Sequence, residues 1–342
     1  MRIPEARGAA STALLELLPQ APNSESIDAL ALAVQDALGQ TTGILADDDL
    51  QLTLFCLYEL HYSGIDVAHA EWEWEPGLIS IRREIERTFE AALRDVVELP
   101  SLEPRDSDGV AAVLFELAAA DTGPSVSRFV AKKASLEQAR EFLIHKSIYQ
   151  LKEADPHTWA IPRLSGRAKA AMVEIQADEY GGGRQDRMHS ALFARTMRGL
   201  DLEDSYGCYV DAVPALTLAS TNMMSMFGLN RRLRGAIVGH LAAYEMTSSQ
   251  PNRLYGNGFR RLGFEEDVTW YFDEHVEADA VHEQIAGRDL AGGLVEAEPE
   301  LLEDVYFGAA AALTLDGMLG EHIMAAWEKG ESSLRTTAPA RA

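Results

Sequence analysis

Apolar residues recur at spacings of three and four along most of the chain, whereas alternating segments of strand type are scarce. This spacing places apolar side chains on one face of an α-helix, so the sequence predicts an all-α fold. Pro76, Ser135 and Gly228 stand where helices are expected to begin or end. We expect helices at residues 26–39, 47–62, 76–98, 108–121, 124–132, 135–154, 164–181, 185–199, 204–226, 229–247, 250–263, 266–287 and 296–329.

The best candidate for a linker is the polar segment SLEPRDSDG, from Ser101 to Gly109. It divides the chain into an N-terminal helical extension at 1–105 and a longer helical bundle at 106–330. The Trp-rich part of the extension is available as a dimer interface. We expect the remaining residues, 331–342, to form a disordered tail.

Composition and charge then exclude several classes of protein. The chain of 342 residues carries 30 Lys and Arg against 54 Asp and Glu, a formal charge of −24, which disfavours nucleic acid and anionic membranes as partners. No window approaches 18 consecutive apolar residues, so no transmembrane span is expected. Two cysteines and no apolar leader segment favour a cytoplasmic protein that acts on small molecules.

Three histidines follow an aspartate by three residues and so share a helix face with it. The pairs are Asp66 with His69, Asp186 with His189, and Asp279 with His282. His275 strengthens the metal-ligand interpretation of the third pair, because positions 275, 279 and 282 form one stripe of a predicted helix. A solvated acidic helix is the alternative interpretation of that stripe, and we expect the histidines at 61, 69, 145, 157 and 240 to be structural.

A second candidate cluster surrounds the pair Asp186 and His189, because Glu179 lies ten residues before the histidine. The intervening Gly181–Gly183 segment is weak in helix propensity and indicates a kink or local unwinding. A plain turn between helices is the alternative. Dinuclear carboxylate sites in helical bundles take a Glu from each of two helices and a carboxylate–histidine pair from each of two others. Glu153 follows a strongly apolar helix and is the expected additional carboxylate.

At these residues the sequence resembles the heme-oxygenase-like diiron oxidases and oxygenases, a family of iron-containing redox enzymes. The resemblance covers about residues 110–290 and includes the strings SIYQLKEADPHTWAIPRL and EIQADEYGGGRQDRMH. It implies a heme-oxygenase-like bundle whose ligands, and catalytic centre, are Glu153, Glu179, His189, His275, Asp279 and His282. The N-oxygenating branch has a further carboxylate, a Glu, seven residues after the second Glu; this chain has Asp186 there, so the resemblance implies Asp186 as a seventh ligand and member of the catalytic centre.

The resemblance also implies the chemistry: two Fe(II) ions per chain bind O2 as cosubstrate, form a peroxo-diferric intermediate, and need an external electron donor. We expect N-oxygenation of the amine of an amino acid or related metabolite to hydroxylamine, nitroso or nitro products, in a biosynthetic homodimer. Two alternatives remain: oxidative C–C cleavage or desaturation of an amino acid or fatty acid, and a non-catalytic metal-binding or ligand-binding helical protein. Candidate substrate contacts are Tyr244, Glu245, Arg253 and Arg260.

Overall fold

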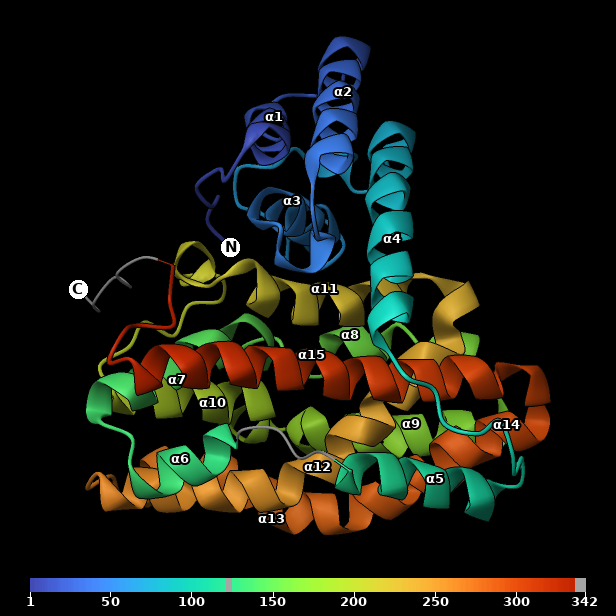
Figure 1. The fold of residues 1–342 in the computed structure, drawn as a ribbon, viewed down its shortest axis with the longest axis vertical. Coiled ribbons are helices and arrows are strands. Elements are labelled where there is room, and N and C mark those ends of the chain that lie inside the picture. The colour runs from blue at the N-terminus through green and yellow to red at the C-terminus, as the bar shows by residue number, and fades with distance from the viewer. Residues whose placement is uncertain (121–124, 336–342) are drawn as a thin grey trace.

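Long helices lying side by side form the larger part of the molecule, and a smaller cluster of helices stands on one face of it (Figure 1). The computed structural model describes residues 1–120 and 125–335, and of residues 277–281 the backbone alone. These described residues contain helices and no β-strand, which confirms the predicted all-α class. None of their helices combines the length and apolar character needed to cross a membrane.

The smaller cluster consists of the first helices of the chain, whose bounds are α1 Ala9–Leu17, α2 Ser24–Gln40, α3 Asp48–Glu59 and α4 Pro76–Val96. The larger part contains the later helices. Their bounds are α5 Ser107–Ala119, α6 Val126–Lys132, α7 Leu136–Gln150, α8 Asp155–Thr158, α9 Gly166–Glu179, α10 His189–Gly199, α11 Ala215–Leu229, α12 Arg234–Arg261, α13 Glu266–Gln284, α14 Gly293–Ala297 and α15 Leu302–Glu328.

One hydrophobic core joins the N-terminal cluster to the bundle. α3 packs on α11, and Asp48 at the start of α3 accepts a hydrogen bond from the backbone N–H of Ala215 at 3.1 Å. Further along the contact, Asn222 donates to the Gln51 side chain at 2.8 Å inside the core. The extension at 1–105 therefore packs on the bundle through α3 and α4, and its role as a dimer interface stays a prediction.

Helices α12 and α15 approach each other closely because glycines lie at their contact. A Cβ atom built on Gly239 would lie 1.8 Å from the carbonyl oxygen of Val305, and one on Gly308 would lie 1.9 Å from that of Ala236. Real side chains do not tolerate such distances, so both positions require glycine. This close crossing fixes the two helices between which the cavity described below lies.

Gly308→Ala is expected to lower the free energy of unfolding by about 1–3 kcal/mol, because the added methyl group must push α12 and α15 apart. Gly317→Ala on the same helix is the matched control, since a Cβ there meets nothing within 4 Å. Removing a helical glycine in open space should stabilise the protein by about 0.5–1 kcal/mol. Denaturant unfolding of both variants measures the difference, and equal effects would contradict the close-crossing account.

The structure differs from the predicted helices in four places. The predicted pair 229–247 and 250–263 is the single helix α12, which continues through Pro251. The segment 204–226 is α-helical only from Ala215, after turns that include Gly207 at φ 78° and a short 3-10 helix at Val210–Ala212. After α13 the chain makes a π-helical segment at Ile285–Gly292, and α15 begins only at Leu302. Helices α1 and α8 were not predicted, since both are short.

The segment after α15 is packed rather than disordered as far as the structure describes it. Ser333 is buried, its hydroxyl group lies 3.0 Å from Nε2 of His145, and its backbone N–H donates to Glu141 at 2.9 Å. Arg335 donates from Nε to Asp48 at 3.1 Å. These contacts correct the predicted boundary of the tail at 331; residues 336–342 lie outside the described range.

Candidate metal centre and adjoining cavity

Six buried carboxylate and imidazole side chains form two groups of three inside the bundle. One group joins Glu153, His189 and His275, and the other joins Glu179, Glu245 and His282. Within each group, one ligand atom per residue lies within 4.8 Å of the others. The ligands come from the turn after α7, the end of α9, the start of α10, and α12 and α13. α13 supplies a histidine to both groups, seven residues apart on one helix face.

The first group is held in orientation by Tyr271, one turn before His275 on α13. Its hydroxyl group donates to both carboxylate oxygens of Glu153, at 3.0 and 2.9 Å. Its backbone oxygen accepts from Nδ1 of His275 at 2.7 Å. That hydrogen bond fixes the tautomer of the imidazole, so Nε2 faces Glu153 Oε1 at 3.6 Å with a lone pair available for a metal.

Two imidazole nitrogens are buried beside carboxylates without a hydrogen bond. Nδ1 of His189 lies 3.0 Å from Oε2 of Glu179, and Nδ1 of His282 lies 3.5 Å from Oε2 of Glu245. Neither nitrogen atom has a partner in hydrogen-bonding geometry among the described residues. Buried polar atoms are normally satisfied, so these nitrogens indicate a missing ligand. On its outer side His282 is oriented by Asp178, which lies 2.9 Å from Nε2.

The charges of this centre shift the pKa values of its members. Burial raises the pKa of Glu179, but the neighbouring imidazoles, His189 first, outweigh it and lower that pKa to about 2. Burial lowers the pKa of His282, but the adjacent Glu245 carboxylate outweighs it and raises that pKa to about 9. Protons on the imidazoles thus balance the buried carboxylates, and binding of metal ions in their place is expected to release protons.

The donor set fits iron. Imidazole nitrogen with carboxylate oxygen suits Fe(II) or Mn(II), and the unsatisfied Nδ1 atoms of His189 and His282 are positioned as ligands. Carboxylates buried to this degree need a counter-charge, which a divalent ion in each group would supply.

The structure brings five of the seven sequence-based ligands together: Glu153, Glu179, His189, His275 and His282. Asp186 lies outside both groups. Its side chain is 64% exposed and pairs with Arg184 at 3.5 Å, after three glycines that all have positive φ. The side chain of Asp279 lies outside the described residues.

The candidate substrate contacts divide in the same way. Tyr244 and Glu245 line the cavity beside the two groups, and Glu245 also belongs to the second one. Arg253 and Arg260 are exposed and do not line it, and Arg260 pairs with Asp273. The sequence assigned Glu245 to substrate rather than metal. Its position in the apolar string HLAAYEM was the available signal, because a carboxylate buried there must be compensated.

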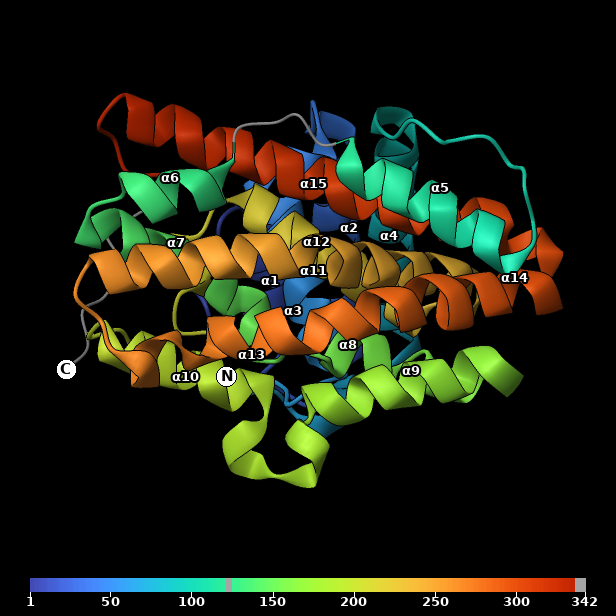
Figure 2. The ribbon, with the colours of Figure 1, turned by 90° about the horizontal axis from the view of Figure 1, so that it is seen from below.

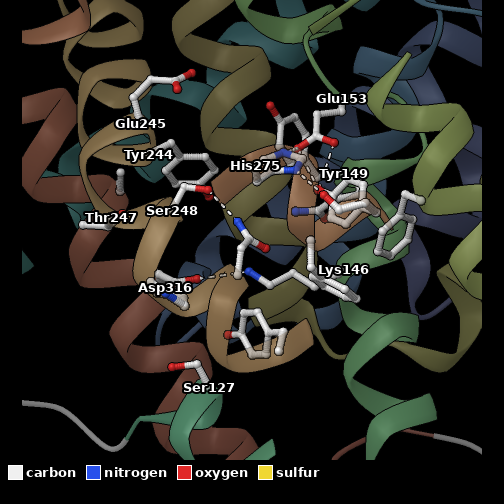
Figure 3. Close-up of a pocket in the computed structure, with 18 of the residues that line it drawn as sticks. Ser127, Lys146, Tyr149, Glu153, Tyr244, Glu245, Thr247, Ser248, His275 and Asp316 are labelled. Atoms are coloured by element: carbon white, nitrogen blue, oxygen red, sulfur yellow. Dashed lines mark hydrogen bonds and ion pairs between the residues drawn. The ribbon is translucent and has the colours of Figure 1, made fainter. Parts of the chain in front are cut away.

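A cavity of about 240 Å³ adjoins the centre and is lined by residues of α7, α12, α13 and α15 (Figure 3). Figure 2 shows the arrangement of these four helices in the bundle. Glu153, Glu179, Glu245 and His275 are in its wall, so both groups open onto it. Aromatic side chains form much of the remaining wall, from Phe142, Tyr149, Phe193, Tyr244, Tyr255, Tyr271 and Phe272. The cavity is smaller than those that hold drug-sized ligands, so it suits a small metabolite.

Comparison with known proteins places this centre in a family. A family model described as an iron-containing redox enzyme matches residues 140–317, just over half of the chain. The chain belongs to this family of iron-containing redox enzymes. All six residues of the two groups lie within the matched range. The family identifies the protein as an oxidoreductase and confirms the resemblance seen in the sequence.

The chain is also similar to nitrosourea synthase from Streptomyces achromogenes subsp. streptozoticus. The two are 28% identical over 232 residues, which is 66% of this chain and 49% of the relative. The chain thus spans about half the length of the curated relative it matches.

Proposed function

We propose that this protein is an O2-dependent non-heme diiron oxygenase that transfers oxygen to the amine nitrogen of an amino acid or a related small metabolite. The observation that carries the proposal is the pair of three-residue groups, each with one imidazole from α13, in the wall of one small cavity. The family of iron-containing redox enzymes and the similarity to a nitrosourea synthase support it.

Two Fe(II) ions held by these groups would supply the binding and reduction of O2, and an external donor would restore their electrons. The residues of the chain have other tasks. Tyr271 holds the carboxylate of Glu153 through both oxygens, so its position is fixed before a substrate enters. The aromatic wall excludes water from the amine and orients it toward the centre.

Asp186 and Asp279 are proposed as further ligands. The three glycines at 181–183, with φ of 65°, 61° and 78°, are separated from Asp186 by only two residues. Backbone of this kind moves at little steric cost. We propose that the segment rearranges when iron binds and brings the Asp186 carboxylate to the second group.

Mass spectrometry of the iron-loaded protein tests the function. The protein, with two irons per chain verified, is given a reductant, ¹⁸O2 and a panel of amino acids, amines and fatty acids. We expect a gain of ¹⁸O on the nitrogen of an amino acid or amine, and no reaction with the zinc-loaded protein, because zinc has no redox chemistry. Loss of carbon from a substrate would instead favour oxidative cleavage, and no change in any compound would favour a non-catalytic protein.

A further inference from the structure

The cavity has a second polar end, away from the metal centre, whose charged residues the proposed chemistry does not use. Lys146 of α7 and Asp316 of α15 both line it and form an ion pair at 3.6 Å. Figure 3 shows the pair below Glu153, His275 and Glu245, with Ser127 beyond it. Asn252 lines the same end, and its amide group donates to Ser248 at 2.7 Å.

Helix α12 connects the polar end to the metal end, because Asn252 follows Glu245 on it by seven residues. Lys146 lies on α7 four residues before Gln150, the last residue of that helix, and Glu153 follows in the turn after it. Residues seven apart lie on one helix face, about 10 Å from each other along the axis. The cavity is therefore a passage of about that length, with metal ligands at one end and a polar site at the other.

The polar end has a charge pattern of its own. Lys146 is the only lysine or arginine among the cavity-lining residues that the structure describes. Burial raises the pKa of Tyr255 and Tyr244, and the charge of Asp316 raises both further, so this carboxylate acts on the interior of the passage. The side chains of Lys146 and Asp316 are 31% and 59% exposed, so the pair is hydrated and can exchange partners.

We propose that Lys146 and Asp316 bind the head group of a free α-amino acid, Lys146 its carboxylate and Asp316 its ammonium group. This inference rests on the proposed function, because it presents the nitrogen of the amino-acid side chain to the metal centre. An extended side chain with a terminal nitrogen spans about 6 Å from Cα. A hydrogen bond of about 3 Å at the head group brings the total close to the length of the passage.

The paired charges explain why both ends of the head group are recognised. A ligand with a carboxylate alone, such as a fatty acid, must compete with Asp316 for Lys146. If it binds, the Asp316 carboxylate loses its ion-pair partner. A peptide or an acylated amine lacks the ammonium group. A zwitterion satisfies both residues at once, so the inserted head group replaces one ion pair by two.

Calorimetric titration of the anaerobic Fe(II)-loaded protein tests the assignment with matched ligands. L-lysine is compared with cadaverine, which lacks the carboxylate, and with 6-aminohexanoate, which lacks the α-ammonium group. L-arginine, agmatine and 5-guanidinopentanoate form a second series. We expect at least one of the two amino acids to bind about 10- to 100-fold more tightly than both of its truncated analogues.

Variants assign each preference to one residue. Lys146→Met should remove the preference over the decarboxylated ligand, and Asp316→Asn the preference over the deaminated one. Lys146→Arg should retain the preference over the decarboxylated ligand. Lys133→Met, at an exposed position outside the cavity, should leave both preferences unchanged. Equal iron content of all variants shows that they are folded.

Binding of neither amino acid, or a preference that survives both substitutions, would overturn the head-group assignment. The two proposals fail separately. Selective binding that depends on Lys146, without oxygen transfer, would refute the N-oxygenase function alone. Oxygen transfer to an amine whose binding ignores both substitutions would refute the head-group site alone.

Discussion

His189→Ala is expected to bind one iron per chain where the parent protein binds two, and to lose oxygenase activity by at least about 100-fold. Loss even of a group that only orients a metal ligand costs about 10- to 100-fold in affinity or activity, and loss of the ligand should cost more. The remaining ligands of that group are one carboxylate and one imidazole, too few to hold the ion. Metal analysis after anaerobic loading and desalting gives the stoichiometry.

His69→Ala is the control, because His69 is an exposed residue outside both groups. It should bind iron like the parent protein. Two irons in His189→Ala would remove His189 from the centre. In the same titration, Asp186→Asn tests the proposed role of Asp186 as a further ligand. We expect this variant to bind one of the two irons more weakly than the parent protein. Unchanged iron binding would show that Asp186 is not a ligand.

Lys152→Met is expected to lower the free energy of unfolding by about 3–5 kcal/mol, the usual cost of leaving one charge of a buried pair alone. The ammonium group of Lys152 pairs with Glu59 in the contact between α3 and the bundle, and the two side chains are 5% and 0% exposed. It also lies 4.1 Å from the ring centre of Tyr62, a cation–π contact. No other cation contacts Glu59 among the described ion pairs.

The double variant Lys152→Met with Glu59→Gln is the matched comparison. It removes the unpaired charge that the single variant leaves, so it should recover part of the lost stability. Denaturant unfolding measures both proteins. A cost below about 1 kcal/mol for the single variant would show that water reaches Glu59. Because Lys152 directly precedes Glu153, the single variant should also weaken iron binding.

Helical periodicity predicted the fold class correctly, because apolar spacing reports directly on a buried helix face. It failed where the tertiary structure overrides local signals. Pro251 breaks the predicted pattern, yet α12 continues through it and packs against α13 and α15. The short α8 has a proline near its start and too few residues for a period to register.

The metal centre was predicted in part. The five residues that the structure brings together belong to local patterns, such as Glu179 with His189, which sequence spacing can show. Glu245 has no such pattern, and only its burial reveals its role. Lys146 and Asp316 are charged residues on helix faces and look like ordinary surface positions. The meeting of α7 and α15 at the cavity is a long-range property that one sequence does not display.

The order of the ligands along the chain has a consequence for how the centre is made during synthesis. In each group the histidine from α13 is the last member to emerge from the ribosome, at 275 and 282. Before that point the nascent chain offers three carboxylates and a single imidazole, an oxygen-rich set suited to magnesium or manganese. In the proposed function, the imidazole and carboxylate set suited to iron is therefore complete only late in translation, after α13 has emerged and docked.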